Sequence, residues 1–163
     1  MSEDRKVAII TGSSQGLGAS IAIKLSQRNI NLVINYSNNK DMALKIKDEC
    51  VNNGVEAITV QADVSSDDDC KKLVQETINT FGKVDILVNN AGTTKFADHS
   101  KLDKLNDEDF INIYKVNVIG PYQMIRAVEP IMKENGFGSV VNISSIAGKT
   151  GIGSSIAYAA SKG

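Results

Sequence analysis

A glycine-rich turn directly follows an apolar, strand-like run near the start of the chain. The run at residues 7–10 is VAII, and residues 11–18 read TGSSQGLG before a helical pattern begins. A strand, a glycine turn and a helix in this order place helix N-terminal N–H groups where an anion binds. Gly12 permits the tight exit from the strand, and Gly16 leaves backbone N–H groups open to a phosphate. Gly18 lets the helix pack close to the sheet, so the segment is typical of a phosphate-binding turn.

The spacing of the glycines distinguishes this turn from two common ones. It is Gly-x3-Gly-x-Gly, which is neither G-x-G-x-x-G nor the P-loop pattern, because no Lys-Ser/Thr pair follows. ATP binding by a P-loop is therefore not expected. Ser13 and Ser14 would add hydroxyl donors to a bound phosphate. Taken alone, such a turn is also compatible with a plain tight connection between a strand and a helix.

Short β-branched runs alternate with helical patterns along the whole chain. The predicted strands span residues 6–11, 31–36, 57–61, 84–89 and 139–144. Helical patterns cover residues 20–28, begin at residues 65–69, and begin again at residues 106–109 to run through Asn117 to about Met132, with a bend or restart near Gly120-Pro121. This alternation predicts an α/β fold with a Rossmann-type, doubly wound parallel sheet.

The charges of the chain nearly cancel, with 18 Lys and Arg against 19 Asp and Glu. A net charge of −1 gives no bulk attraction to nucleic acid or to an anionic membrane surface. The apolar runs are far shorter than the roughly 20 residues that cross a bilayer, and residues 1–6 are too polar for a signal peptide. We expect a cytoplasmic protein that acts on a small molecule, with no nucleic acid and no membrane as partner.

Neither the cysteines nor the histidine follow a metal-ligand pattern. Cys50 and Cys70 fall in charged, helix-like segments without a CxxC pair, so we expect free thiols. His99 stands in a polar stretch with no other His or Cys near it, whereas a metal site needs about three or four ligands. We expect a loop histidine and no bound metal.

Four further motifs follow the glycine turn in a fixed order. They are Asn89-Asn90-Ala91-Gly92 after the fourth predicted strand, Asn117 in a helix, Ser144-Ser145 after the fifth predicted strand, and Tyr158-Ala-Ala-Ser-Lys162 near the end of the chain. Together with residues 11–18, this set resembles the short-chain dehydrogenase/reductases over essentially the whole chain. Each motif alone is weak, but five in the family's order leave little room for coincidence.

The resemblance implies a catalytic role for four residues. Tyr158 would donate or accept the proton, and Lys162 would stabilise its phenolate and hold the nicotinamide ribose. Ser145 would bind the substrate oxygen; it is preferred to Ser144 because family members carry this serine thirteen residues before the tyrosine, as here. Asn117 would order a water molecule in the proton relay.

The chemistry of carbonyl reduction explains why these residue types occur together. A hydride carries no proton, so a second group must protonate the oxygen. A free tyrosine ionises only near about pH 10, and a nearby cation favours its phenolate. Lys162 follows Tyr158 by four residues, which puts both side chains on one helix face. The Ser145 hydroxyl would donate to the developing alkoxide.

The resemblance also assigns residues to an NAD(P) cofactor. Besides Tyr158 and Lys162, these are Gly12, Ser14, Gln15, Gly16, Leu17, Gly18, Tyr36, Ser37, Asp63, Val64, Asn90, Ala91 and Gly92. Two of these residues have an alternative interpretation. Asn90, together with Asn89, would tie neighbouring strand ends together, and Asp63 would cap a turn.

The end of the second predicted strand bears on the choice between NAD and NADP. An acidic residue there favours NAD, whereas a basic one accommodates the extra phosphate of NADP. The strand ends in Tyr36 and Ser37, so both the carboxylate and the arginines of relatives are absent. We expect NADP(H) to be preferred, with NAD(H) as the alternative. Ser37, Asn38 and Asn39 would donate to the 2′-phosphate, and Lys40 would lend charge.

These features predict one NAD(P)-binding Rossmann domain over residues 1–163. The expected function is an NAD(P)(H)-dependent oxidoreductase that interconverts a carbonyl and a secondary alcohol, with a 3-oxoacyl thioester as the first substrate to test. The alternatives are a truncated, non-catalytic nucleotide-binding module and an isomerase or dehydratase on the same fold.

The resemblance carries two expectations about the whole molecule. Members of the family continue beyond the lysine of YxxxK through two more strands and a substrate-binding segment. We therefore expect a truncated form whose sheet is incomplete on the C-terminal side, with the fifth strand as an exposed apolar edge. Family members also associate as tetramers, so we expect a homo-oligomer.

Overall fold

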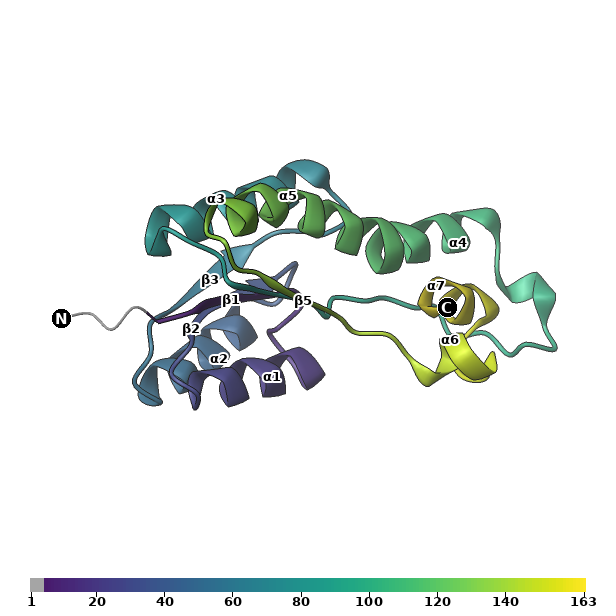
Figure 1. Ribbon diagram of the computed structural model, residues 1–163. Coiled ribbons are helices and arrows are strands. Elements are labelled where there is room, and N and C mark those ends of the chain that lie inside the picture. Colours follow the sequence, from purple (N-terminus) through teal and green to yellow (C-terminus); the bar gives the residue numbers. More distant parts are fainter. Residues whose placement is uncertain (1–4) are drawn as a thin grey trace.

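The computed structural model describes residues 5–163 and shows a parallel sheet with helices on both faces (Figure 1). Within these residues the strand order is β3-β2-β1-β4-β5, and every neighbouring pair is parallel. The strands are β1 Val7–Ile10, β2 Asn31–Tyr36, β3 Ala57–Gln61, β4 Ile86–Asn89 and β5 Ser139–Asn142. The predicted doubly wound sheet is confirmed. The signal-peptide expectation concerns residues 1–4 as well, and these lie outside the described residues.

Helices cover the two faces of the sheet in pairs (Figure 1). The longer ones are α1 Gly16–Ser26 and α2 Lys40–Asn52 on one face, and α3 Asp67–Phe81 and α5 Gly120–Glu134 on the other. The remaining helical segments are η1 Leu102–Lys104, α4 Asp107–Tyr114, the π-helical turn η2 Lys115–Ile119, α6 Ile146–Thr150 and α7 Ile156–Lys162. In the described part of the chain, none of these helices has the length and apolar character needed to cross a membrane.

The central strands divide their side chains between two apolar cores. Val7 and Ile9 face the core that α3 and α5 complete, and Ala8 and Ile10 face the core that α1 and α2 complete. Successive side chains of a strand point to opposite faces, so a strand covered on both sides needs apolar residues at every position. This explains the continuous apolar run at residues 7–10, which is buried throughout.

The capping signals in the sequence mark the helix starts correctly. The Ser66 hydroxyl accepts the N–H of Asp69 at the start of α3, and Asn106 forms a reciprocal capping box with Asp109 at the start of α4. The predicted start of the first helix is wrong by four residues, because α1 begins at Gly16, inside the glycine turn. The apolar pattern used for the prediction begins only after that turn.

The long predicted helix is interrupted one turn earlier than expected. The π-helical turn η2 separates α4 from α5, and the Gly120 N–H donates to the Lys115 carbonyl. Pro121 lies in the first turn of α5 and has no N–H to donate to the preceding helical turn. The wider turn accommodates the proline ring, which would clash with the carbonyl of Asn117 in a regular helix.

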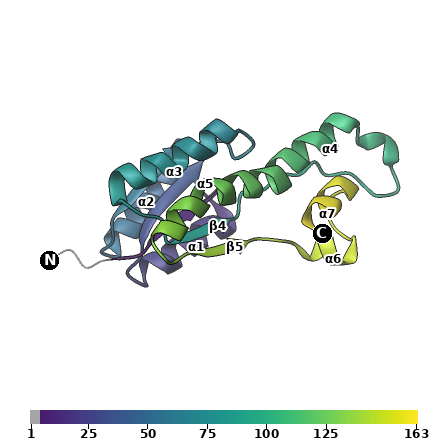
Figure 2. The ribbon, with the colours of Figure 1, turned by 45° about the horizontal axis from the view of Figure 1, so that its top comes forward.

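A smaller group of helices lies beyond the carboxyl edge of the sheet. Figures 1 and 2 both show α4, α6 and α7 on the side opposite the N-terminus, away from the two main layers. Helix α7 packs against α4, α6 and η2. The segment that follows β5 is therefore brought back beside the segment that follows β4.

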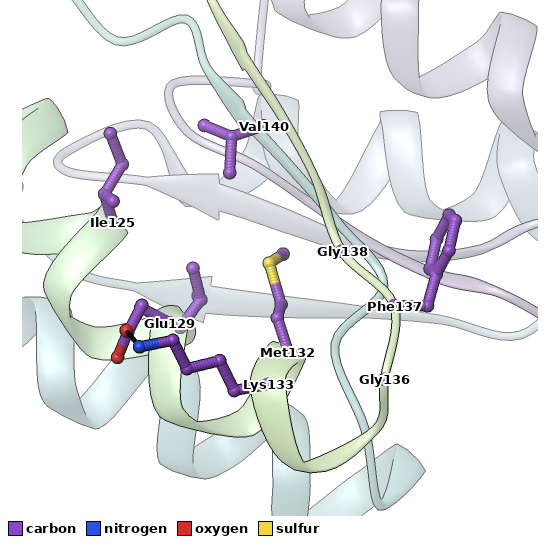
Figure 3. A pocket seen from close by; sticks show the side chains of 9 residues that line it. Ile125, Glu129, Met132, Lys133, Gly136, Phe137, Gly138 and Val140 are labelled. Carbon is purple, nitrogen blue, oxygen red and sulfur yellow. Dashed lines mark ion pairs between the residues drawn. The ribbon is translucent and has the colours of Figure 1, made fainter.

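The edge strand β5 is exposed over its whole length, as expected for the fifth strand. On one side of it, a hollow of about 420 Å³ lies between β5 and the C-terminal half of α5 (Figure 3). Met132 packs against Gly138 there, and Glu129 forms an ion pair with Lys133. The hollow adjoins Phe137 and Gly138 at the amino end of β5, so it lies away from the glycine turn.

The cysteines and the histidine occupy ordinary structural positions. Cys50 and Cys70 are free and buried in α2 and α3, and burial raises the pKa of Cys70 to about 11. Both behave as core residues in their thiol form. His99 is exposed in the irregular segment between β4 and η1. No metal-holding group of His, Cys, Asp or Glu side chains occurs among residues 5–163.

The contrast between central and edge strands predicts that a valine-to-alanine substitution lowers the free energy of unfolding more in a central strand than in the edge strand. Val33→Ala in β2 removes two buried methyl groups and is expected to lower the free energy of unfolding by about 2 kcal/mol. Val141→Ala in β5, where the valine is 44% exposed, is expected to change it by less than about 0.5 kcal/mol. Urea denaturation followed by circular dichroism measures both, and equal losses would contradict the assignment of β5 as an open edge.

Candidate active site

A cleft of about 810 Å³ runs along the carboxyl edge of β1 to β4. Most of the residues predicted to bind a cofactor line it: Gly12, Ser14, Gln15, Gly16, Tyr36, Ser37, Asp63, Val64, Asn90, Ala91 and Gly92. Carboxyl ends of parallel strands are where ligands bind in open α/β sheets, at the point where the strand order reverses. Here that point lies between β1 and β4, and the glycine turn borders it.

The three glycines of the turn are needed for different reasons. Gly12 has a φ of +62°, and a Cβ there would lie 3.0 Å from the Ala91 Cα. Gly16 has a φ of +59°, and a Cβ there would point into open space. At Gly18 a Cβ would collide with the Asn90 amide nitrogen, because α1 starts close to the end of β4. Gly16 alone therefore leaves free room at the helix N-terminus.

Asn35 holds the glycine turn in shape, a role that the sequence analysis missed. Its Oδ1 accepts the N–H of Gly12 at 2.9 Å, and its Nδ2 donates to the carbonyls of Ala62 at 3.0 Å and Val60 at 3.3 Å. The side chain is 1% exposed. One signal was present in the sequence, because a polar residue inside a buried apolar strand requires hydrogen-bond partners.

Asn90 and Thr11 tie the end of β4 to the end of β1. Asn90 Nδ2 donates to the carbonyls of Thr11 and Gly12, at 2.9 and 3.1 Å. The Thr11 hydroxyl accepts the N–H groups of both Asn90 and Ala91 at 3.0 Å. The structural interpretation of Asn90 is thus observed, and the residue also lines the cleft. Asn89 makes the corresponding link to β5 through Asn142 Oδ1 at 2.8 Å.

One expectation about the cofactor cleft needs correction, and two others stay predictions. The Ser13 hydroxyl is fully buried: it donates to the Ile10 carbonyl at 2.7 Å and accepts the Asn35 N–H at 3.0 Å, so it cannot reach a phosphate. Leu17 is 55% exposed and is not among the residues that line the cleft. Lys40, in the first turn of α2, does not line it either. Exact side-chain direction at a turn is not encoded in a sequence motif.

The segment after β3 closes the floor of the cleft. Asp63 caps a turn, since its Oδ1 accepts the N–H and the hydroxyl of Ser65 at 2.9 and 2.8 Å. The Val64 carbonyl accepts the side-chain amide of Gln123 at 2.8 Å. A Cβ at Gly120 would lie 2.9 Å from Val64 Cγ2, so glycine there lets α5 approach this segment. Both Asp63 and Val64 line the cleft.

A second cavity, of about 340 Å³, contains the predicted catalytic tyrosine and lysine. It is lined by Asn90, Gly92, Thr93, Thr94, Phe96, Ile143, Ser144, Ser154, Tyr158 and Lys162. Asn90, Gly92 and Thr93 also line the cleft, so the two spaces meet at the loop after β4. A hydrogen bond of 2.5 Å between the Thr94 and Ser154 hydroxyls joins the two loops that form this cavity.

Tyr158 and Lys162 lie on one side of the short helix α7, which the Ser155 hydroxyl caps at Tyr158 N–H. Lys162 Nζ donates to the Ile143 carbonyl at 3.0 Å and lies 6.0 Å from the centre of the Tyr158 ring. Burial lowers the pKa of the Lys162 ammonium, because desolvation disfavours its charged form. Within residues 5–163 the Tyr158 hydroxyl makes no hydrogen bond and is open to the cavity.

Asn117 joins the loop after β4 to α7 instead of facing either cavity. Its Oδ1 accepts the Thr93 N–H at 2.8 Å, and its Nδ2 donates to the Thr93 carbonyl at 3.0 Å and to Ser161 Oγ at 2.9 Å. Ser161 Oγ in turn donates to the Tyr158 carbonyl at 2.8 Å. The π-helical turn places Asn117 at this junction. Ser161 is a positioning residue that the sequence analysis did not single out.

The two serines after β5 differ in what their hydroxyl groups do. Ser144 lines the cavity, and its hydroxyl donates to the Lys162 carbonyl at 2.7 Å. Ser145 is the N-cap of α6, where its Oγ accepts the Ala147 N–H at 3.2 Å. Ser145 is not among the residues that line the cavity, but its hydroxyl hydrogen has no acceptor within the described residues.

The chain is similar to known proteins over almost its full length. A sequence model described as short chain dehydrogenase matches residues 6–163. A 3-oxoacyl-[acyl-carrier-protein] reductase of Staphylococcus epidermidis is 35% identical over 157 residues, covering 96% of this chain and 63% of that reductase. The chain thus spans less than two thirds of the length of this curated relative.

Two solved structures share the fold. One is the crystal structure of a short-chain dehydrogenase/reductase from Burkholderia xenovorans. It superposes with a TM-score of 0.95 at 38% identity, covering 99% of this chain and 68% of that one. NAD+-bound xylitol dehydrogenase superposes with a TM-score of 0.89 at 29% identity, covering 96% of this chain and 59% of that one.

The hydrogen bonds of Asn35 predict a large cost for its removal. Asn35→Ala leaves the part-buried Gly12 N–H and the buried Ala62 carbonyl without this partner and is expected to lower the free energy of unfolding by about 3 kcal/mol. Asn38→Ala, on the exposed segment after the same strand, is expected to change it by less than about 0.5 kcal/mol. Urea denaturation compares the two, and a mild effect of Asn35→Ala would show that the turn keeps its shape without this amide.

Proposed function

The chain belongs to the short-chain dehydrogenase family, and on that premise we propose that it is part of an NAD(P)(H)-dependent oxidoreductase that interconverts a carbonyl and a secondary alcohol. The observation that carries this proposal is the junction of the two cavities. The cleft beside the glycine turn meets the cavity of Tyr158 and Lys162 at Asn90, Gly92 and Thr93. A cofactor in the first space would therefore reach a substrate in the second.

The cleft fits a dinucleotide in shape and in chemistry. The open space at Gly16 and the N-terminus of α1 suit a pyrophosphate, because helix N-terminal N–H groups point at it and no Cβ intervenes. The edge formed by Tyr36, Ser37 and Asp63 would hold the adenosine. Lys162 and the backbone near Gly92 would hold the nicotinamide ribose. When bound, such a cofactor supplies or accepts a hydride.

Tyr158 would move the proton at its hydroxyl oxygen. In the reducing direction it donates a proton to the carbonyl oxygen as negative charge develops there, and in the oxidising direction it accepts one. The Lys162 ammonium lies on the same side of α7 and would place its positive charge near the reacting oxygen. Its hydrogen bond to the Ile143 carbonyl holds it near the tyrosine.

Ser145 would donate a hydrogen bond to the substrate oxygen. The geometry supports this choice over Ser144, because the Ser144 hydrogen is already donated to the Lys162 carbonyl. The Ser145 oxygen accepts an N–H and keeps its hydrogen available. Both amide hydrogens of Asn117 bond to protein atoms, so a relay water would bind it only through Oδ1. Asn117 would also act by positioning Thr93 and α7.

The finer assignments concern the cofactor and the substrate. We propose NADP(H) as the preferred cofactor, because no carboxylate follows Tyr36 at the end of β2 to bind free ribose hydroxyls. We propose a 3-oxoacyl thioester as substrate, because the similar Staphylococcus epidermidis protein is a 3-oxoacyl-[acyl-carrier-protein] reductase.

Self-association is proposed as well, since the helical segment from α4 to α5 exposes Ile111, Val118, Ile119 and Tyr122.

The open space at Gly16 predicts a selective loss of cofactor binding. Gly16→Ala puts a methyl group where the pyrophosphate would lie and is expected to weaken NADPH binding at least about ten-fold by displacing its N–H contacts. Gly82→Ala, at the C-cap of α3, has a similar φ of +74° and equally open surroundings. Both variants should lose about 1 kcal/mol of stability, because alanine is strained in a left-handed backbone conformation. Calorimetric titration with NADPH then compares two variants of similar stability, so a weaker affinity of Gly16→Ala reports on binding and not on folding.

The proposed proton transfer predicts a loss of turnover without a loss of binding. Tyr158→Phe is expected to slow the oxidation of NADPH by an acetoacetyl thioester by about 100-fold or more, while NADPH still binds. Tyr122→Phe, on the exposed face of α5, should be as active as the unaltered chain. Binding of NADPH with no turnover by the unaltered chain would favour a non-catalytic nucleotide-binding module.

A further inference from the structure

The charged residues of the cleft are few, and only one of them is positive. Of the described residues that line it, Asp63 and Asp69 are acidic and Lys72 is basic. NADPH carries a pyrophosphate, which would meet the N-terminus of α1, and a 2′-phosphate, for which a cation in the cleft is a favourable partner. The position and the partners of Lys72 therefore matter.

The ammonium group of Lys72 has no ion-pair partner within residues 5–163. Its neighbour Lys71 is paired, with Nζ 2.7 Å from an Asp67 oxygen and 3.8 Å from an Asp68 oxygen. The acidic residues of the cleft are occupied locally: Asp63 Oδ1 accepts from Ser65, and Asp69 Oδ2 accepts the Asp63 N–H at 2.8 Å. Lys72 is thus the free cation on this wall.

Lys72 lies at the end of the cleft where the ribose of an adenosine is expected. It follows Asp69 by one helical turn, and Asp69 is bonded to the segment just after β3. The ends of β3 and β2 are adjacent, because Gln61 pairs with Tyr36 and donates its side-chain amide to the Ser37 carbonyl at 2.8 Å. A pyrophosphate at the turn after β1 puts the adenosine ribose at the end of β2.

We propose that Lys72 binds the 2′-phosphate of NADP(H) and sets the preference for this cofactor. The inference rests on the proposed function, because it assumes that the cleft holds a dinucleotide. The cation would come from α3, in place of the arginine that is missing at the end of β2 and of Lys40, which does not line the cleft. A lysine suits this task, because its long flexible stem carries a compact charge across a gap.

The test compares two adjacent lysines that differ in position and not in charge. Lys72→Gln is expected to weaken NADPH binding about five-fold, as for one exposed charge contact, and to leave NADH binding unchanged. Lys71→Gln removes the same charge outside the cleft and should leave both affinities unchanged. Calorimetric titration of each variant of the 163-residue chain with NADPH and with NADH gives the four values. The difference in NADPH affinity between the unaltered chain and Lys72→Gln should shrink as the ionic strength rises.

Each other outcome contradicts the assignment in a different way. Equal weakening of NADPH and NADH by Lys72→Gln would mean that Lys72 contacts the adenine or ribose, which overturns the 2′-phosphate role. Unchanged NADPH affinity, or an equal effect of Lys71→Gln, would overturn it as well. If the unaltered chain bound neither dinucleotide, the proposed function would fail, and this inference with it; binding of NADPH with no effect of Lys72→Gln would leave the proposed function intact.

Discussion

The buried amide of Asn35 is the interaction on which the rest of the site depends. It bonds to the backbone of two neighbouring segments: the glycine turn after β1, at Gly12, and the end of β3, at Val60 and Ala62. Backbone groups at the ends of parallel strands have no further ladder partners, so buried ones must be satisfied by side chains. One amide does this at the point where the glycine turn leaves the sheet. Asn90 and Thr11 perform the same task between β1 and β4.

The two parts of the site are held by different forces. The cleft rests on a sheet whose two faces are covered by apolar cores, so its walls are set by close packing. Tyr158 lies in α7, which Figures 1 and 2 show with α4 and α6 beyond the sheet, and several hydrogen bonds connect this region. These connections are Asn117 to Thr93 and Ser161, Thr94 to Ser154, and Lys162 to Ile143. The positions of Tyr158 and Lys162 therefore depend on a polar network between separate segments of the chain.

Much of the fold was predictable because its signals are local. Residues 31–36 and 57–61 form strands with the predicted bounds, since β-branched and apolar runs of that length suit a covered parallel sheet. Ser66 and Asn106 cap helices as predicted, because capping needs only residues three positions apart. The break at η2 was placed one turn late, since it arises from the fit between Pro121 and the preceding turn. The direction of the Ser13 hydroxyl was also wrong, because it depends on Asn35, which is far away in the sequence.

The sequence by itself determined the parallel sheet, the glycine turn and the placement of Tyr158 and Lys162 on one helix face. Each of these follows from residue type and spacing within a single segment, through burial, backbone freedom or helical periodicity. Only the tertiary structure decided that Asn35 shapes the turn, that the Ser144 hydroxyl is occupied while that of Ser145 is available, and that Lys72 is the cation of the cleft. These properties depend on distances between groups from different segments, and packing of helices on the sheet sets those distances.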